Sequence, residues 1–404
     1  MRIALITSNP FPIGNVSTNR FTTYCKSLVK KSVFVKVLIL HPSKSEEAKC
    51  NAFSGIYKNI SYQNLANYAY WSDKTSSIKK IVTLLKSLFR SIKALRKDQI
   101  DTIIIVQDNF LIYFFYWLYS SIYGIKLFLE KNEYPFGYLK LNKIERYFQN
   151  IKYSFFDGFI IMTEELVNYY SKVKTSKANI YLLPMSVDCD RFADLSKNLV
   201  TEKYIGCTFG YHNRDGLADT LKAYLLYKNI IGISSYKLWM IGDFKNLINK
   251  NEITKLIEDN NLEEVALLKG PYRSDKIPQI LFDAECLITT PQKYTSGGFP
   301  TKLGEYLATG NPVISTNCGE IGHYLKNRIN CFLSEPCDIN SIADNLVFIH
   351  NNQQEASVIG KKGLNLAKNS FNTDIYIDPL VLFLQTGNNK NDRITINSLL
   401  NPKH

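Results

Sequence analysis

The segment Ser296–Glu320 places glycines, one lysine and two glutamates around a short predicted helix. Pro300 suits the first turn of a helix, where its missing N–H costs little. The next three residues, Thr301, Lys302 and Leu303, open the helix. Because a helix N-terminus exposes N–H groups and a partial positive charge, it is a natural site for an anion. The pattern therefore predicts an anion-binding site at the start of this helix.

A carboxylate and two glycines flank the predicted anion site. Gly297 and Gly298, followed by Phe299, give the backbone room to approach a ligand closely. Glu305 follows one turn later, and its carboxylate can accept hydrogen bonds from two neighbouring hydroxyls, such as those of a ribose. An anion site beside a diol acceptor is the chemistry that holds a nucleotide diphosphate sugar. We therefore predict that residues 297–305 bind such a donor.

The same segment resembles the donor-site signature of the retaining glycosyltransferases of family 4, which have the GT-B fold. Gly310–Ile314 fits the G-x-P-V-[IV] strand of that signature, and Glu305 fits its second glutamate. The first glutamate, which faces the donor sugar in the family, is replaced by Gly297. The resemblance covers most of the chain and is strongest from about Tyr204 to Leu333.

The resemblance implies a specific fold and reaction. The fold would be α/β, with two Rossmann-like doubly wound domains that face each other across a cleft. The reaction would move a sugar from a nucleotide diphosphate sugar to a glycan or lipid-linked glycan, with retained anomeric configuration. The implied setting is the assembly of bacterial capsule, O-antigen or lipopolysaccharide. Such enzymes need neither a metal nor another cofactor.

Composition narrows the class of protein independently. A chain of 404 residues fits two domains, and 45% hydrophobic residues exclude a mostly disordered chain. Eight cysteines occur without a C-x-x-C pair, and only five histidines are present, so neither a disulfide framework nor a histidine-built metal site is expected. The opening sequence MRIALITSNPFP indicates a buried strand rather than a secretion signal, which favours a cytoplasmic location.

The net charge of +13 limits the class of partner. A basic chain can bind phosphate-rich substrates, an anionic membrane surface or nucleic acid. No helix-turn-helix, zinc-finger or RNP motif accompanies the charge, so we expect no nucleic-acid partner.

Short apolar strands alternate with helical patterns twice along the chain, which indicates doubly wound parallel sheets. Predicted strands in the first half are 2–7, 34–40, 102–106, 126–130 and 158–162, and in the second half 204–209, 236–241, 265–269 and 286–290. We predict an acceptor domain over 1–185 and a donor domain over 203–370. A helix over 371–386 would cross back to the first domain, and 387–404 would be a polar tail.

Two further positions are predicted to contact the donor. The loop Gly206–Gly216 leaves a strand and enters a helix, and the resemblance implies a cation there for the diphosphate. Arg214 is the candidate, together with Lys302, because both can stabilise the charge that develops as the nucleotide leaves. Tyr272, in the loop after the strand 265–269, can stack on the base. For each of these side chains, simple exposure to solvent is the alternative.

The acceptor side is predicted in the first domain. Gly14 lies in the loop after the first strand and resembles a family glycine that approaches the donor phosphate, while Asn15 and Arg20 would contact the acceptor. Glu130 and Glu133 end a strand where many relatives carry a histidine, and one of these carboxylates would steady positive charge at the anomeric centre. For Arg20, a surface salt bridge is the alternative.

Two helical segments suit either a membrane or the protein core. Ile78–Lys97 carries seven basic residues and no acidic one, with apolar residues at helical spacing, so it can bind the inner leaflet of a membrane or cover the core. Phe110–Phe128 is apolar for nearly a bilayer span, but a crossover helix ending near Tyr123 followed by a strand fits it better.

Two other functions stay open on the sequence. A nucleotide-sugar epimerase on the same fold would need several acid/base side chains, and the few histidines disfavour it. A catalytically silent sugar-nucleotide-binding subunit would explain Gly297 and the aspartate at position 215.

Overall fold

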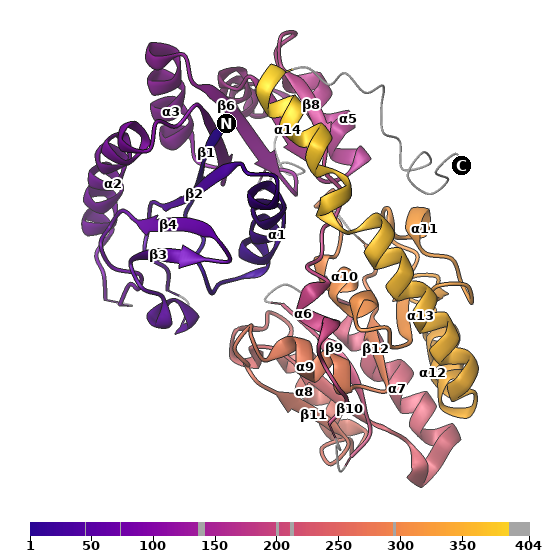
Figure 1. Cartoon of the computed structure of the whole chain (residues 1–404). Helices are drawn as coiled ribbons and strands as arrows, with labels where there is room; N and C mark the ends of the chain where they lie inside the picture. The colour runs from indigo at the N-terminus through magenta and orange to yellow at the C-terminus, as the bar shows by residue number, and fades with distance from the viewer. Residues whose placement is uncertain are drawn as a thin grey trace, which may run out of the picture. The chain divides into compact units, whose positions relative to one another are not determined.

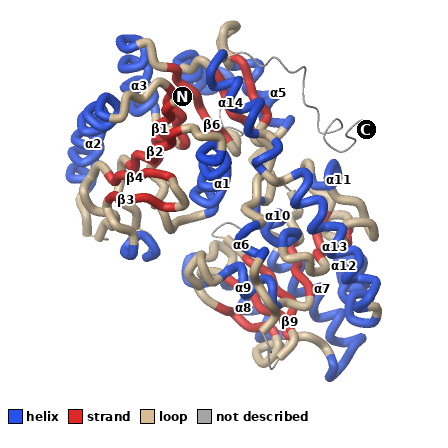
Figure 2. Tube along the Cα trace, in the orientation of Figure 1, coloured by secondary structure: helices blue, strands red, loops and turns tan. Residues whose placement is uncertain are grey.

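The computed structural model describes residues 1–44, 46–72, 74–135, 142–198, 202–210, 214–293 and 296–387. Within these residues the chain forms two compact units. Among the described residues, the first comprises Met1–Ser186, Ser296–Gly298 and 373–387, and the second comprises the described parts of Val187–Thr295 and Phe299–Asn372. Figure 1 labels the elements of both units, and Figure 2 shows that helices and strands alternate in each.

The first unit is built on an eight-stranded sheet in the order β3-β4-β2-β1-β5-β6-β7-β8. All neighbouring strands are parallel except the edge pair β3 and β4, which is antiparallel. The strands are β1 (Arg2–Thr7), β2 (Phe34–Ile39), β3 (Ser54–Tyr57), β4 (Ile60–Asn64), β5 (Thr102–Val106), β6 (Lys126–Lys131), β7 (Gly158–Ile161) and β8 (Asn179–Leu182). Strand β5 is buried along its whole length, as its continuous apolar sequence predicts.

Helices cover both faces of this sheet. The α-helices of the first unit are α1 (Val16–Lys30), α2 (Ser77–Lys97), α3 (Phe110–Tyr123), α4 (Lys143–Ile151), α5 (Glu164–Val173) and α14 (Ile377–Thr386). Helices α2, α3 and α5 pack their apolar residues into one core cluster with the sheet. Helix α14 contacts α1, and its Phe383 packs on Phe128 of β6 with ring centroids 5.3 Å apart.

The second unit has a parallel six-stranded sheet in the order β11-β10-β9-β12-β13-β14. Its strands are β9 (Tyr204–Thr208), β10 (Lys237–Ile241), β11 (Ala266–Lys269), β12 (Cys286–Thr289), β13 (Val313–Thr316) and β14 (Phe332–Ser334). Its α-helices are α6 (Asp190–Ala193), α7 (Leu217–Ile231), α8 (Lys250–Asp259), α9 (Ile277–Asp283), α10 (Thr301–Ala308), α11 (Ile321–Tyr324), α12 (Ile339–Asn351) and α13 (Gln353–Ser370). The chain runs outward from β9 to β11 and then returns to β12, so the strand order reverses between β9 and β12.

The prediction of two doubly wound parallel sheets is confirmed, while several boundaries of the strands and helices differ. The first helix begins at Val16, where the Asn15 side chain accepts a hydrogen bond from the Thr18 N–H and caps it. The terminal helix begins at Ile377 rather than 371, because α13 continues to Ser370. The polar tail predicted over 387–404 lies outside the described residues from 388 onward.

The apolar segment Phe110–Phe128 forms the crossover helix α3 and the start of strand β6, as the second interpretation predicted. Gly124 ends the helix in the left-handed region, with φ +64°. Within the described residues, none of the helices combines the length and the apolar character needed to cross a bilayer.

Candidate functional site

The carboxyl ends of β9 and β12 form the edge of the second sheet at which open α/β folds bind ligands. The loop after β9 is fastened to the end of β12 here. The backbone N–H of Thr290 donates to the carbonyl oxygen of Asp215 at 3.2 Å, and the Thr290 hydroxyl donates to that of Gly216 at 2.7 Å. Gly216 has φ +71°, and a Cβ at this position would lie 1.7 Å from the Thr290 carbonyl oxygen. Only glycine fits at position 216.

Lys302, in the first turn of α10, reaches this edge. Its Nζ lies 2.7 Å from Oδ1 of Asp215 and donates to the carbonyl oxygen of Thr208 at 2.8 Å. The other carboxylate oxygen of Asp215 accepts the Gly210 N–H at 2.7 Å. The structure therefore brings Lys302 and the loop after β9 together, as expected if both contact one diphosphate.

A buried tyrosine fixes α10 against β9. The Tyr306 hydroxyl lies 2.6 Å from the Thr208 backbone nitrogen and 2.8 Å from its hydroxyl. Burial raises the pKa of Tyr306 well above its usual value, so the phenol stays neutral and can accept the backbone N–H. Burial also raises the pKa of the neighbouring Cys207 to about 12, which makes this thiol an inert core group. The helix N-terminus is thus held rigidly at the sheet edge.

The N-terminus of α10 itself is uncapped. Pro300 precedes the helix and provides no side-chain hydrogen bond to its first N–H groups. The side chain of Thr301 is partly exposed, whereas those of Leu303 and Phe299 are buried. Phe299 packs on the ring of Tyr324, with centroids 5.6 Å apart. The side chains of Phe299 and Leu303 therefore belong to the apolar core, and the prediction that they contact the donor is corrected.

Glu305 lies on the same face of α10 as Lys302, because residues three apart in a helix are neighbours. Its Oε1 pairs with the guanidinium of Arg191, from α6. The second terminal nitrogen of Arg191 donates to the carbonyl oxygen of Ser274 at 2.9 Å. One arginine thus joins the predicted ribose acceptor to the loop that was predicted to hold the base.

Sequence reasoning missed Arg191, because it lies between the two predicted domains, which were placed at 1–185 and 203–370. The only available signal was its place in an acidic and aromatic string, Asp188–Phe192. Tyr272 lies in the loop bridged by Arg191 and is about one-third exposed, so its ring is accessible. Arg214 is exposed in the turn before α7, two residues from Gly216. The structure gathers these residues in the second unit, while the ligand contacts predicted for them stay predictions.

The glycine pair 297–298 packs closely against the first unit's own backbone and side chains. A Cβ on Gly297, which has φ +71°, would lie 2.8 Å from both Leu166 and Tyr134 side-chain atoms. A Cβ on Gly298 would lie 2.5 Å from the carbonyl oxygen of Asn132. These contacts within the first unit give both glycines a structural reason, while the predicted approach of their backbone to a donor stays a prediction.

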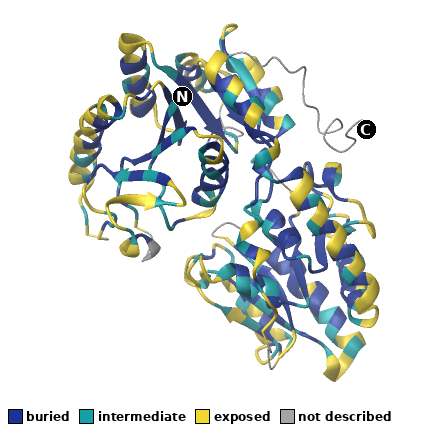
Figure 3. Ribbon diagram, in the orientation of Figure 1, coloured by how far each residue is buried: buried dark blue, intermediate teal, exposed yellow. Residues whose placement is uncertain are grey.

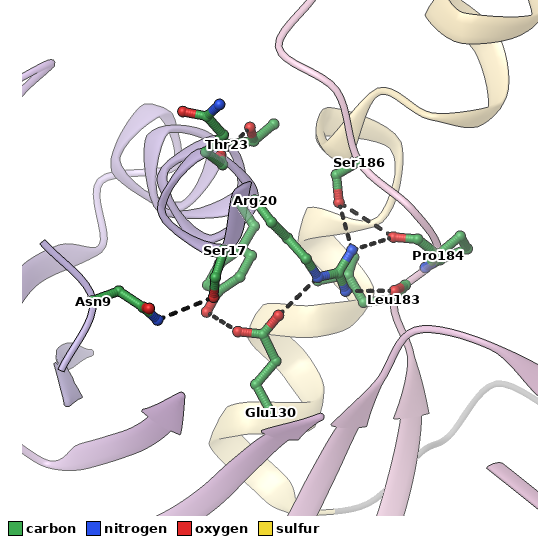
Figure 4. A network of polar contacts seen from close by, with 10 residues as sticks. Asn9, Ser17, Arg20, Thr23, Glu130, Leu183, Pro184 and Ser186 are labelled. Carbon is green, nitrogen blue, oxygen red and sulfur yellow. Dashed lines mark hydrogen bonds and ion pairs between the residues drawn. The ribbon is translucent and has the colours of Figure 1, made fainter. Parts of the chain in front are cut away.

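Arg20 and Glu130 form a buried ion pair in the first unit (Figure 4). Nε of Arg20 donates to Oε1 of Glu130 at 2.8 Å, and the two side chains are 2% and 0% exposed. The remaining guanidinium nitrogens donate to the carbonyl oxygens of Leu183 and Pro184, both at 2.9 Å. The Tyr24 hydroxyl donates to the other carboxylate oxygen at 2.7 Å. Neither charged side chain is accessible. The predictions that Arg20 contacts the acceptor and that Glu130 acts in catalysis are therefore corrected, because the pair has a structural role.

Gly14 and Asn15 also serve the fold of their own loop. A Cβ on Gly14 would lie 2.3 Å from the carbonyl oxygen of Pro10. The Asn15 side chain caps α1 and donates to Asn9 Oδ1 at 2.9 Å. These contacts occupy the side chain that was predicted to bind acceptor. By contrast, Glu133 is exposed after β6 and remains a candidate for a contact with substrate.

No group of three or more histidine, cysteine, aspartate or glutamate side chains gathers in metal-binding geometry within the described ranges. The polar groups at the edge of β9 are instead one ammonium, one carboxylate, backbone N–H groups and a helix N-terminus. This set can bind an anion through direct charge and hydrogen bonds.

Residues 202–352 match the family model described as glycosyl transferases group 1. Over 96% of the chain, the structure is similar to sucrose-phosphate synthase from Thermosynechococcus elongatus, which is covered in full with a TM-score of 0.73 and 15% identity. It is similar over the same share to HepE of Anabaena, solved in complex with UDP and glucose, also covered in full with a TM-score of 0.70 and 12% identity.

A glycosyltransferase from Rickettsia africae is similar over 96% of this chain and 99% of its own, with a TM-score of 0.69 and 15% identity. No curated protein matches the sequence significantly.

Proposed function

We propose that the chain is a glycosyltransferase of the group 1 type with the GT-B fold, and that it transfers a sugar from a nucleotide diphosphate sugar to a glycan or lipid-linked glycan with retention of configuration. One observation carries the donor half of this proposal. Lys302 and Glu305 lie on one face of α10, and Lys302 reaches the carboxyl end of β9 where the strand order reverses. A diphosphate beside Lys302 would place a ribose within reach of Glu305.

The diphosphate would be bound by charge and by backbone groups. Backbone N–H groups at the start of α10 would donate to its oxygens, and Lys302 would neutralise part of the charge. Asp215 already holds Lys302 by one oxygen and the loop backbone by the other, so the ammonium is positioned before the ligand arrives. As the glycosidic bond to the nucleotide breaks, these groups and Arg214 would stabilise the growing negative charge on the diphosphate.

The nucleoside would be bound by Glu305 and the loop that follows β11. Glu305 would accept from the two ribose hydroxyls, while Arg191 holds its carboxylate from the other side. Tyr272 would stack on the base. Since position 297 is a glycine and carries no carboxylate, recognition of the sugar would rest on other groups. We propose that the reaction proceeds without a metal, because the donor site supplies cations and N–H groups for the leaving diphosphate.

We further propose a setting in bacterial surface polysaccharide synthesis, with the enzyme at the cytoplasmic face of the inner membrane. HepE of Anabaena was solved with UDP and glucose, and the pneumococcal O-GlcNAc transferase GtfA with UDP and GlcNAc. These structures support a nucleotide-sugar donor as a working choice, with UDP as the first nucleotide to test.

Thermal unfolding with UDP, GDP, ADP and TDP tests the donor site. A ligand at 100 times its Kd stabilises the folded state by about 2.7 kcal/mol, so one nucleotide should raise the melting temperature by roughly 5–10 °C. Lys302→Met should remove this increase, while Lys361→Met, an exposed lysine of α13, should keep it. If Lys302→Met retained the full increase, the diphosphate assignment would be wrong.

Incubation with nucleotide sugars and a glycan acceptor tests the reaction. Released nucleotide with an elongated acceptor of unchanged anomeric configuration, read by nuclear magnetic resonance, is the expected result. Interconverted donor sugar would instead indicate an epimerase, and tight binding without turnover would indicate a silent binding subunit.

A further inference from the structure

Helix α2 has two apolar stripes, and only one of them faces the core. Leu84, Leu88 and Leu95 are buried in the core of the first unit. A second stripe, centred about 110° around the helix from the first, carries Ile78, Val82, Leu85 and Phe89, spaced four, three and four residues apart. Ile78 is 76% exposed and Phe89 67% exposed. A surface helix normally has one apolar stripe, so the outer one needs a separate explanation.

Helix α3 continues this outer surface. Phe110, Phe114, Leu118 and Ile122 recur every four residues and are all exposed. The helix has no charged residue over its fourteen positions. Figure 3 shows exposed residues along both α2 and α3.

Aromatic and cation contacts join the two helices. Phe89 packs edge-on against Phe115 of α3, with ring centroids 6.0 Å apart. The Arg96 guanidinium lies over the ring of Tyr123 at 4.7 Å from its centroid. The two outer stripes therefore belong to one surface, which we call the α2–α3 surface. A contiguous apolar surface of this kind on a folded unit marks a site of interaction.

The charge around this surface has one sign. Helix α2 carries seven basic residues and no acidic residue, and Lys86, Lys93 and Lys97 are exposed next to the outer stripe. Long basic side chains beside an apolar stripe can lay their methylene groups on it and keep the ammonium at a polar boundary. A second copy of the chain bound through this face would bring two sets of positive charges together, so self-association is disfavoured.

We propose that the α2–α3 surface docks on a bilayer that contains anionic lipid, with the uncharged stripe of α3 inserted among the acyl chains and the lysines of α2 on the headgroups. This arrangement matches interfacial helices, which bury an apolar face at the headgroup boundary and bind anionic lipid through a basic flank. The inference rests on the proposed location at the membrane, and it names anionic lipid as the partner and the α2–α3 surface as the site that binds it. All of the residues that it uses lie outside the donor site. A lipid-linked acceptor would be within the same membrane.

Flotation with vesicles of phosphatidylcholine, with and without phosphatidylglycerol, tests both halves of the surface. The full chain should float with the mixed vesicles and weakly with phosphatidylcholine alone. The triple variant Lys86→Gln, Lys93→Gln and Lys97→Gln should lower partitioning onto the mixed vesicles about 100-fold, at roughly fivefold per basic residue. Arg90 and Arg96 stay unchanged because they bond Leu65 and Tyr123.

The matched charge control is Lys361→Gln, Lys362→Gln and Lys368→Gln, three exposed lysines of α13 in the second unit. This variant has the same net charge and should keep full binding. Equal loss in both triple variants would mean that net charge alone drives adsorption and would overturn the proposal.

The apolar half is tested by Phe114→Ser with Leu118→Ser. This variant should lose at least tenfold of its partitioning on both vesicle types, even at high salt, where charge is screened. Ile233→Ser, at a fully exposed apolar position of the second unit, is the control.

Two outcomes would overturn the inference. The first is unchanged flotation of Phe114→Ser with Leu118→Ser, and the second is a lipid-free dimer in analytical ultracentrifugation that this variant dissociates. Nucleotide-induced stabilisation should persist in every variant, so that a failure of lipid binding is distinguishable from a failure of the proposed donor site.

Discussion

The buried pair Arg20–Glu130 gives a sharp test of structural against catalytic roles. In Glu130→Leu the Arg20 guanidinium stays buried without its counter-ion, although the acceptors Leu183 O and Pro184 O remain. The Tyr24 hydroxyl also loses its acceptor. Breaking a buried ion pair from one side costs about 3–5 kcal/mol, and an orphaned buried hydroxyl costs about 1–3 kcal/mol.

Because the carbonyl oxygens of Leu183 and Pro184 still accept from Arg20, the cost of breaking the ion pair should lie near the lower end of its range of about 3–5 kcal/mol. Together with the orphaned Tyr24 hydroxyl, we expect a loss of about 4–5 kcal/mol in the unfolding free energy. For a unit of roughly 200 residues, that loss lowers the melting temperature by roughly 8–20 °C. Urea unfolding followed by circular dichroism gives the free energy directly. Glu133→Leu, at an exposed glutamate just after the same strand, should change it by less than about 1 kcal/mol.

A double-mutant cycle separates the pair from its surroundings. Arg20→Met alone leaves the Glu130 carboxylate buried with only the Tyr24 donor, so it should also be strongly destabilising. Arg20→Met with Glu130→Leu removes both charges and should cost at least about 2 kcal/mol less than the sum of the single changes. Nucleotide affinity should not change, because the proposed donor contacts lie in the second unit.

The reasoning would be refuted by one combination of results. If Glu130→Leu retained the melting temperature of the wild type and abolished sugar transfer, Glu130 would act in the reaction and not in the fold.

Three further predictions concern the second unit. Gly216→Ala should lower the unfolding free energy by about 2 kcal/mol more than Gly124→Ala, since both residues are in the left-handed region but only Gly216 is in close contact with backbone; equal losses in urea unfolding would contradict this. Burial and then the charge of Lys203 lower the pKa of His350, so the unfolded chain takes up a proton at higher pH than the folded chain. Stability should therefore fall as pH drops below about 6.5, and His350→Gln should show a flatter decline between about pH 7.5 and pH 5.5; an unchanged slope would exclude this histidine as the cause. Arg191→Met should weaken nucleotide binding about three- to tenfold in calorimetry by freeing the Glu305 carboxylate to rotate, and an unchanged Kd would remove Arg191 from the site.

Local sequence determined the elements and the fold class. Apolar runs such as residues 102–106 predicted buried parallel strands, and the structure confirms them. The glycine, proline and lysine spacing around α10 predicted the start of this helix, and the structure confirms it. The GT-B resemblance is confirmed by the match over 202–352 and by the similar structures. The strands and helices depend on neighbours within a few residues, so they can be predicted from the sequence alone.

Tertiary structure decided which polar groups are accessible. Arg20 and Glu130 are 110 positions apart, and only the folding of α1 onto β6 joins and buries them. Arg191 reaches Glu305 across 114 positions, and Gly297 meets Tyr134 and Leu166 through a loop that returns to the first unit. A sequence shows which groups can ionise or donate, but burial and pairing arise from the three-dimensional packing of distant segments. The sequence therefore determined the chemistry available to this protein, and the fold decided which of those groups face a ligand.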